Sequence, residues 1–334
     1  MLKVMICDDS AFMRKIFSDT VESDSELTVI DTAYNGQNLL DKLEKNKADL
    51  LMLDIEMPVL NGLETLKIVK EKYSDLPVIM VSALDNSETV FKALDLGAFD
   101  FIPKPGGSIS LNIDSIKEEL ISKLKAAHQS KKERVTKPVQ ITKQIKEFPI
   151  VAIGTSSGGP RALTTLLSDI PDNFPAAFVI VQHMPAGFTK TLAERLNTVS
   201  GLNIKEAETG DKLEKGKGLL APGDYHLEIN HKGKVELNQK PKEHGVRPSV
   251  DYMLKSLARN FNKKRITACI LTGMGRDGAA GMKELITGGA YGIIEAKESA
   301  LVYGMPSAAA AKGAYDEILN INDIAARLIE IVEG

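Results

Sequence analysis

The sequence predicts an α/β protein of two domains, each with a mostly parallel, doubly wound sheet. The chain has 334 residues, enough for two separate cores. In both halves, short apolar runs alternate with segments whose apolar residues recur at helical spacing. Between the halves, residues 128–147 are rich in Lys, Gln and Thr and show no sustained apolar period. We therefore expect one domain at 1–127, a linker at 128–147 and a second domain at 148–334.

Composition narrows the class of protein. The formal net charge of -3 argues against a general electrostatic footprint for nucleic acid. No apolar run approaches the roughly 20 residues that span a bilayer, and the first strand runs into acidic residues rather than a cleavage site. We expect a cytoplasmic protein with no nucleic-acid partner and no membrane insertion. Cys7 and Cys269 lie in separate apolar runs, which predicts two buried thiols rather than a disulfide.

The first half contains five apolar runs typical of strands, at 3–6, 29–33, 50–53, 78–81 and 101–102. Helical spacing follows the first run and recurs at 36–45, 62–73, 88–96 and 113–127. The carboxyl ends of parallel strands meet at one edge of a sheet, where sites form in doubly wound folds. The polar residues expected at that edge are Asp8, Asp9, Asp54, Ser82 and Lys104.

These five side chains predict a metal and phosphoryl site. Three clustered carboxylates repel one another unless a cation intervenes, and oxygen ligands favour Mg²⁺. Asp54 lies between the other two and can act as a nucleophile that forms an aspartyl phosphate. Ser82 can donate a hydrogen bond and Lys104 a charge to the phosphoryl oxygens. For any one of these residues a solvated loop is the favoured interpretation, but five at successive strand ends favour a site.

The motifs of the first half resemble the receiver domain of bacterial two-component response regulators over roughly residues 1–125. They are Asp8-Asp9-Ser10, Asp54-Ile55-Glu56-Met57-Pro58 with Asn61-Gly62-Leu63, Val81-Ser82-Ala83 and Lys104-Pro105. The resemblance implies a flavodoxin-like fold, with Asp54 as phosphoacceptor and a histidine kinase as phosphodonor. It also implies Mg²⁺ bound by Asp8, Asp9, Asp54 and the Glu56 carbonyl, with Ser82 and Lys104 contacting the phosphoryl group.

Three further positions follow from this resemblance. Phe101 takes the place of the family's switch aromatic, although a packed core residue explains it equally well. Lys104-Pro105 takes the place of the family's cis-prolyl bond. Asn61 stands where the family more often has Asp, a surface difference that leaves the site intact.

The second half repeats the alternation. Strands are predicted at 149–153, 178–181, 218–220, 266–271 and 292–294, and helices at 161–167, 189–197, 249–260, 278–287 and 323–332. Residues 225–238 alternate around a polar turn at 231–234, which predicts a β-hairpin added to the parallel core.

The turn that follows the strand predicted at 149–153 has three possible interpretations. Gly154-Thr155-Ser156-Ser157-Gly158 fits the G-x-S-x-G elbow, which presents a serine nucleophile between a strand and a helix. The same glycine-rich turn could cradle an anion at the N-terminus of the helix. It could also simply connect the two elements. The turn alone does not decide among them.

Two other strand ends supply the partners of a nucleophile. His183 follows the second strand and Asp277 follows the run at 266–271. An imidazole can take the serine proton near neutral pH, and a carboxylate can fix its tautomer. The remaining histidines fit other roles: His128 in the linker, His226 in a strand, His231 in a turn and His244 in a basic loop. Asp211 and Asp251 fit a turn and a helix face.

The order Ser, His, Asp differs from that of α/β-hydrolases. The second half instead resembles the catalytic domain of the chemotaxis methylesterase CheB family, over about residues 148–334. The matching motifs are Gly154-Thr155-Ser156-Ser157-Gly158-Gly159, Gln182-His183-Met184-Pro185, Ala221-Pro222-Gly223, Arg247-Pro248-Ser249-Val250-Asp251, Leu271-Thr272-Gly273-Met274-Gly275, Asp277-Gly278 and Tyr303-Gly304-Met305-Pro306.

This resemblance implies Ser156 as nucleophile, His183 as general base, Asp277 as its orienting acid and the Met274 N–H in the oxyanion hole, with no cofactor for the esterase. It implies hydrolysis of γ-glutamyl methyl esters on cytoplasmic segments of chemoreceptors and deamidation of particular receptor glutamines. Glu295-Ala296-Lys297 departs from the Gln and acidic residues expected there.

We therefore expect phosphorylation at Asp54 to regulate the esterase, with the unphosphorylated receiver covering the Ser156 cleft. The rival hypothesis is a response regulator whose second half only binds a partner, the Ser156 turn serving as an anion site. A DNA-binding output is disfavoured, because no basic recognition helix occurs in the second half.

Overall fold

A computed structural model describes residues 1–83, 87–104, 113–129 and 148–333, apart from the side chains of 113–116. The chain divides into two compact units, Met1–Lys131 and Lys132–Gly334. Most of the predicted linker, 130–147, and the predicted cis-prolyl residue Pro105 lie outside the described residues. None of the helices in the described ranges is long and apolar enough to cross a membrane.

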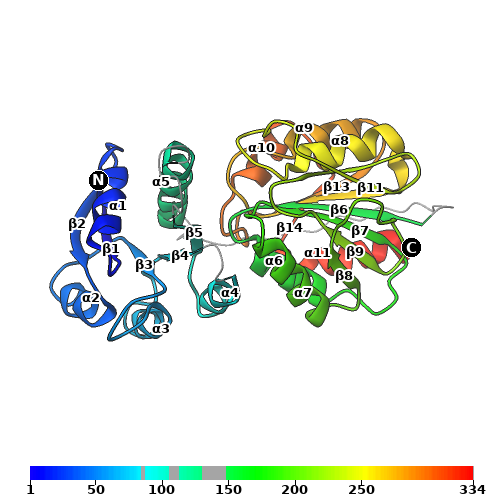
Figure 1. Ribbon diagram of the computed structural model, residues 1–334. Coiled ribbons are helices and arrows are strands. Elements are labelled where there is room, and N and C mark those ends of the chain that lie inside the picture. Colours follow the sequence, from blue (N-terminus) through cyan, green and yellow to red (C-terminus); the bar gives the residue numbers. More distant parts are fainter. Residues whose placement is uncertain (84–86, 105–112, 130–147, 334) are drawn as a thin grey trace. The chain divides into compact units, whose positions relative to one another are not determined.

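As predicted, the first unit is a five-stranded parallel sheet (Figure 1). The strand order is β2-β1-β3-β4-β5. Its strands are β1 (Leu2–Cys7), β2 (Leu27–Ala33), β3 (Leu50–Asp54), β4 (Val78–Ser82) and β5 (Asp100–Pro103). Its helices are α1 (Ala11–Glu22), α2 (Gly36–Leu43), α3 (Gly62–Lys72), α4 (Ser87–Asp95) and α5 (Ile113–Gln129). Every residue of β3 and β4 is buried, which explains their continuous apolar runs.

Helix boundaries in this unit follow local capping. Ser10 accepts a hydrogen bond from the Met13 N–H at the start of α1, and Asn61 forms a capping box with Glu64 at the start of α3. The last helix continues past the predicted boundary at residue 127 to Gln129. The placement of His128 in the linker was therefore wrong: it lies in the last turn of α5.

The second unit is a seven-stranded parallel sheet in the order β14-β13-β12-β6-β7-β9-β8. The strands are β6 (Ile150–Thr155), β7 (Ala177–Gln182), β8 (Asn203–Glu206), β9 (Lys217–Leu220), β12 (Ile266–Ile270), β13 (Tyr291–Glu295) and β14 (Glu317–Leu319). The helices are α6 (Gly159–Ser168), α7 (Phe188–Val199), α8 (Val250–Asn260), α9 (Ala279–Thr287), α10 (Met305–Ala311) and α11 (Ile321–Glu333), with a 3₁₀ turn at Lys263–Arg265. Figure 1 shows α8, α9 and α10 on one face of the sheet and α6, α7 and α11 on the other.

Two strands and one helix of this unit, β8, β14 and α10, were not predicted from the sequence. The two strands form the edges of the sheet and are only four and three residues long. β8 is Asn-Ile-Lys-Glu and β14 is Glu-Ile-Leu, so neither has an apolar run long enough to predict a strand, and their pairing depends on the neighbouring strand. The predicted hairpin is present as β10 (His226–Ile229) and β11 (Val235–Asn238). It forms a separate antiparallel sheet packed against α8 instead of extending the parallel core.

Candidate functional site

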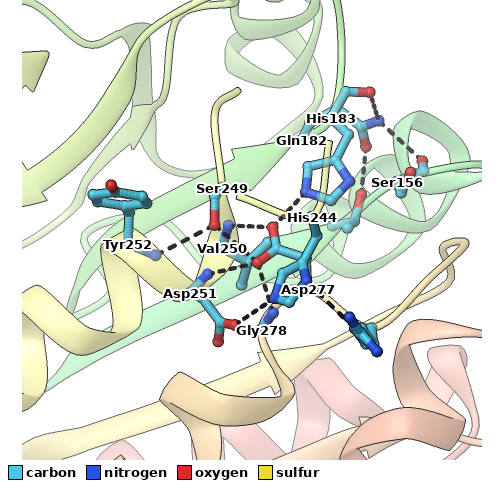
Figure 2. Close-up of polar contacts among 12 residues, drawn as sticks. Ser156, Gln182, His183, His244, Ser249, Val250, Asp251, Tyr252, Asp277 and Gly278 are labelled. Atoms are coloured by element: carbon cyan, nitrogen blue, oxygen red, sulfur yellow. Dashed lines mark hydrogen bonds and ion pairs between the residues drawn. The ribbon is translucent and has the colours of Figure 1, made fainter. Parts of the chain in front are cut away.

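The Ser156 turn lies at the carboxyl end of β6 and is held by its neighbours on both sides. The Ser156 N–H donates to the Thr272 carbonyl at 3.0 Å. The side-chain amide of Gln182, the last residue of β7, donates to the carbonyls of Ser156 and His183, each at 2.9 Å. Figure 2 shows this amide between the two residues. One buried amide therefore fixes the position of Ser156 relative to His183.

Two glycines make this turn possible. Gly158 has φ of +80°, a left-handed conformation that side chains disfavour. A Cβ on Gly159 would lie 1.8 Å from both Gln182 Oε1 and Thr155 Oγ1. Both positions require glycine, because α6 begins in direct contact with the β6 and β7 strand ends.

His183 and Asp277 form the predicted pair. His183 Nε2 lies 2.8 Å from Asp277 Oδ2, and both side chains are almost fully buried (Figure 2). Because Nε2 faces the carboxylate, Nδ1 is the ring nitrogen left to accept a proton from a serine. Ser156 and His183 are both among the described residues, and no hydrogen bond joins Ser156 Oγ to the His183 ring. Hydrogen bonds between a nucleophile and its base often form only when substrate is bound.

Asp277 is held in its charged form by the start of α8. Its Oδ1 accepts hydrogen bonds from Ser249 Oγ at 2.8 Å and from the Asp251 N–H at 3.0 Å. Its Oδ2 accepts from the Val250 N–H at 2.6 Å. Burial raises the pKa of Asp277, but the hydrogen bond and charge of His183 and these backbone N–H groups outweigh it, so the pKa falls from 3.8 to about 2. Asp277 is therefore ionised at neutral pH and can stabilise a His183 imidazolium.

The loop after β12 lies directly against the serine. A Cβ on Gly273 would lie 2.7 Å from Ser156 Cβ, which is too close. Thr272 Oγ1 donates to the Ser157 carbonyl at 2.8 Å and accepts from the Val302 N–H at 2.9 Å. Met274, the predicted oxyanion donor, therefore follows a segment that is fixed against the nucleophile turn.

Glu295, the residue that departs from the CheB pattern, is buried behind this loop. It ends β13, its side chain is 1% exposed, and its Oε2 accepts from the Thr272 N–H at 2.8 Å. Its Oε1 accepts from Ser299 Oγ at 3.0 Å. Burial raises the pKa of Glu295 from 4.5 to about 7, against the smaller lowering by these two hydrogen bonds. An acid at this position can still support the loop, because it accepts the same backbone hydrogen bond that an amide oxygen accepts.

A second histidine–aspartate pair lies beside the first. His244 Nε2 is 3.1 Å from Asp251 Oδ2, and His244 Nδ1 is 3.5 Å from Arg276 Nε. Both ring nitrogens are occupied, and no described serine is bonded to the pair, so it lacks a nucleophile. His226 is fully buried: its Nδ1 accepts from the Ser249 N–H at 3.2 Å, and its Nε2 lies 3.1 Å from the Pro241 carbonyl. His231 lies in the hairpin turn.

The first unit brings the predicted phosphorylation residues together. Ligand atoms of Asp8, Asp9 and Asp54 all lie within 4.8 Å of one another. Lys104 Nζ lies 2.7 Å from Asp54 Oδ2 and 3.1 Å from Asp8 Oδ2. Burial and the Asp8 charge raise the pKa of Asp54 from 3.8 to about 6, against the lowering by Lys104. An all-carboxylate cluster with this residual repulsion fits a divalent cation.

The other predicted residues of this site lie around the cluster. Ser82 ends β4 and its hydroxyl donates to the Ala83 carbonyl at 3.0 Å. Glu56 is exposed, and its N–H lies 3.4 Å from Asp54 Oδ1. Phe101 is buried in β5, with Lys123 Nζ 5.3 Å from its ring centre. A groove beside the cluster is lined by residues that include Asp9, Glu56 and Thr89.

Comparison with known proteins identifies both units. The family model for CheB methylesterase matches residues 151–328, and the model for the response regulator receiver domain matches residues 4–113. The chain belongs to the CheB methylesterase family. Its two-domain α/β fold and the resemblance of each half to its family are thereby confirmed.

Relatives in this family match along nearly their whole length. A protein-glutamate methylesterase/protein-glutamine glutaminase of Pyrococcus abyssi is 40% identical, over 99% of this chain and 94% of the relative. One of the same name from Bacillus subtilis is 41% identical, over 100% of this chain and 99% of the relative. The crystal structure of the Thermotoga maritima CheB methylesterase catalytic domain is 44% identical, with a TM-score of 0.53, and covers 55% of this chain and 99% of that chain.

Sequence reasoning missed the residues that hold the family's expected triad. Ser249, Gln182 and the N-terminus of α8 reach Asp277 or the Ser156 turn from strands and helices far away in the sequence. The N-cap signal at Ser249 was visible, because a serine precedes an apolar helical pattern. Which carboxylate it would approach depended on the packing of α8 against the sheet.

Proposed function

We propose that Ser156, His183 and Asp277 carry out acyl transfer on glutamyl side chains of chemoreceptors, with Met274 as oxyanion donor. The supporting observation is the buried His183–Asp277 pair, 2.8 Å apart, beside the serine turn in a chain of the CheB methylesterase family. The activity is that of a carboxylic ester hydrolase, a protein-glutamate methylesterase and protein-glutamine glutaminase.

The reaction follows from the positions of these groups. His183 Nδ1 takes the proton of Ser156 Oγ as the oxygen attacks the ester carbonyl, and Asp277 stabilises the imidazolium that forms. The Met274 N–H stabilises the oxyanion of the tetrahedral intermediate. His183 then gives its proton to the departing methoxide, which leaves as methanol. Water repeats the sequence on the acyl-enzyme and releases the glutamate. With a glutamine substrate, ammonia leaves in place of methanol.

The receiver unit supplies the regulation that we propose. Asp54 accepts a phosphoryl group from a histidine kinase. Asp8, Asp9, Asp54 and the Glu56 carbonyl would hold Mg²⁺, which would neutralise negative charge at this site when bound. Ser82 and Lys104 then contact the phosphoryl oxygens. Lys104 already bridges Asp54 and Asp8, so phosphorylation changes its partners first. Phe101 is proposed to follow this change as the switch aromatic.

We place this chemistry in the cytoplasm. The described cysteines, Cys7 and Cys269, are free and buried, and burial raises the pKa of both thiols. Unpaired buried thiols are typical of a reducing compartment. The substrates that we propose are the cytoplasmic segments of methyl-accepting chemoreceptors.

Methanol release from a methylated receptor fragment tests the catalytic assignment. Ser156→Ala in the full chain is expected to lower kcat by about 10⁶-fold, because the remaining groups lack a nucleophile. Ser157→Ala is the matched control, because Ser157 is a buried neighbour whose carbonyl, not its hydroxyl, contacts Thr272. Retained activity in Ser156→Ala, or equal losses in both variants, would contradict the assignment.

A small-molecule phosphodonor tests the regulation. We expect the rate of methanol release by the full chain to change when Mg²⁺ and the phosphodonor are added. The reason is that a phosphorylated receiver can make contacts that differ from those of the unphosphorylated receiver. Asp54→Asn is expected to abolish the response. Equal wild-type rates with and without the phosphodonor would show that phosphorylation does not control the esterase.

A further inference from the structure

Four cationic side chains surround the carboxyl edge of the catalytic sheet. Arg161 lies in the first turn of α6, after β6, and Lys190 in the first turn of α7, after β7. Arg276 lies in the loop after β12, and Lys297 follows β13. These four strands are consecutive neighbours in the parallel sheet, so their carboxyl ends lie at one edge, which also carries Ser156. We call these four side chains together the basic rim. All four are exposed.

Among the described residues, the basic rim makes no hydrogen bond to a carboxylate. Arg276 Nε lies 3.5 Å from His244 Nδ1, and the other ring nitrogen of His244 faces Asp251. In the described part of the chain, none of its four members forms an ion pair. The only acids in the loops after these strands and in the first helical turns that follow are Asp277, which is buried against His183, and Glu298. The rim therefore carries a positive charge, although the whole chain has a net charge of -3.

Several other cations of the same unit are paired with acids. Around the hairpin, Lys240 and Arg259 pair with Glu228, each at 2.7 Å or less, and Arg247 pairs with Asp224 at 2.6 Å. Lys255 pairs with Glu243 at 2.7 Å. The four successive strand ends at the edge that carries the serine thus bring four cations without an ion pair in the described residues, and their charge is available to a partner of opposite charge.

We propose that the basic rim binds acidic residues flanking the target glutamyl ester, so that this enzyme prefers esters embedded in an acidic protein segment. The proposal rests on the proposed function and names the substrate class for it. A glutamyl ester is itself neutral, so its side chain offers the rim no charge. Each turnover, however, converts an ester into a carboxylate. A segment with several esters therefore gains affinity for the rim as its first sites are hydrolysed, which favours continued hydrolysis of the same segment.

Two matched peptides test the proposal on the full-length enzyme. Both contain one glutamyl methyl ester, flanked by Glu residues in the acidic peptide and by Gln residues in the neutral peptide. The measured quantity is the ratio of kcat/KM for the acidic peptide to that for the neutral peptide. We expect a wild-type ratio of roughly tenfold at low salt, falling towards one as added salt screens exposed charges.

Substitutions locate the preference. Arg161→Gln combined with Lys190→Gln is expected to lower the ratio about threefold, and Arg276→Gln to lower it by a similar factor. Lys264→Gln is the matched control: Lys264 is also exposed, but it precedes β12 and so lies at the opposite edge of the sheet. Its ratio is expected to equal the wild-type ratio.

Two results would overturn the proposal. A wild-type ratio near one would show that flanking carboxylates are not recognised. A wild-type preference that survives both rim variants, or that falls equally in Lys264→Gln, would show that the rim is not the binding surface. If the wild type hydrolysed neither peptide, the proposed function itself would be wrong, and the substrate assignment with it.

Discussion

Asp54 in the first unit and Asp277 in the second are both buried at the carboxyl edge of a parallel sheet, yet their pKa values are shifted in opposite directions. Asp54 is 1% exposed and Asp277 is 2% exposed. The pKa of Asp54 is raised to about 6, whereas that of Asp277 is lowered to about 2. Burial raises the pKa of both groups, so their different partners must account for the difference.

Those partners differ in number and sign. Asp277 accepts hydrogen bonds from Ser249, from the start of α8 and from His183, and none of the carboxylates that the structure describes is bonded to it. Asp54 has Lys104 on one side but faces the Asp8 carboxylate on the other. The charge of Asp277 is therefore stabilised by groups of the protein itself. Asp54 instead lies in a cluster of negative charge, and a bound cation or a phosphoryl group can alter the charge of that cluster. One site is fixed and the other is responsive.

The largest effect is expected from removing the charge of Asp277. Asp277→Asn should lower kcat on a methylated receptor fragment by about 10⁴-fold, because the amide cannot stabilise the imidazolium and favours the wrong tautomer. Asp251→Asn is the matched control, since Asp251 lies in the first turn of α8, beside Asp277, but its side chain pairs with His244. Its loss should stay below about tenfold. If kcat fell by similar factors in Asp277→Asn and Asp251→Asn, both substitutions would be acting by disturbing the start of α8, and the triad would not be supported.

Glu295 extends the comparison to the pH dependence of stability. Its pKa is about 7 in the folded chain and 4.5 when exposed, so the folded state binds more protons between these values, and stability falls as pH rises from about 4.5 to 7. Glu295→Gln should remove this loss and increase the free energy of unfolding at pH 8 by about 3 kcal/mol relative to wild type. Asp277 acts in the opposite sense, because its stabilisation is lost as pH falls from 3.8 towards 2.

A matched control lies on the adjacent strand. Glu317 in β14 is also buried, but Arg327 pairs with it at 2.9 Å. Glu317→Gln should therefore destabilise the catalytic unit at pH 8, where Glu295→Gln stabilises it. Chemical denaturation of the full chain at pH 5 and pH 8 measures both. A destabilised Glu295→Gln at pH 8 would show that the ionised carboxylate is favourable where it lies.

Asp8→Asn should leave Asp54 with one fewer carboxylate charge beside it, which makes its surroundings more like those of Asp277. Removing the like charge is expected to lower the pKa of Asp54 towards 3.8 and to weaken Mg²⁺ binding roughly tenfold, because one oxygen ligand loses its charge. Carboxyl ¹³C NMR follows the first change and calorimetric Mg²⁺ titration the second. Asp100→Asn, a buried acid of β5 paired with Lys123, should leave Mg²⁺ binding as in the wild type. Unchanged Mg²⁺ affinity in Asp8→Asn would exclude Asp8 as a ligand.

The smallest effect is expected from Ser249→Ala. It removes one donor to Asp277 and the N-cap of α8, which together should cost about 1 kcal/mol of stability and lower kcat severalfold. Ser256→Ala, at a buried serine of the same helix that accepts from the Ile229 N–H, should cost similar stability without lowering kcat. An equal drop in kcat for both would show that helix stability alone limits the rate.

Much of this protein was predictable from its sequence, because the relevant signals are local. The apolar runs of β3, β4, β6 and β12 identified the parallel sheets, since strands buried on both faces need apolar side chains at every position. The residues that follow those strands identified the carboxyl edge of each sheet, with Asp54 in the first unit and Ser156 and Asp277 in the second. The roles of these site residues stay predictions until the variants above are measured.

The tertiary structure decided what the strand ends contact. Nothing in the local pattern of Asp54 or Asp277 distinguishes a raised pKa from a lowered one, because that depends on whether Asp8 or the start of α8 packs beside the carboxylate. The edge strands β8 and β14 were missed for the same reason: their pairing comes from their neighbours. The sequence by itself determined the fold class and the candidate chemical groups. Packing between segments distant in sequence determined the charge state and partners of each group, since electrostatic and hydrogen-bond energies depend on distances that only the folded chain sets.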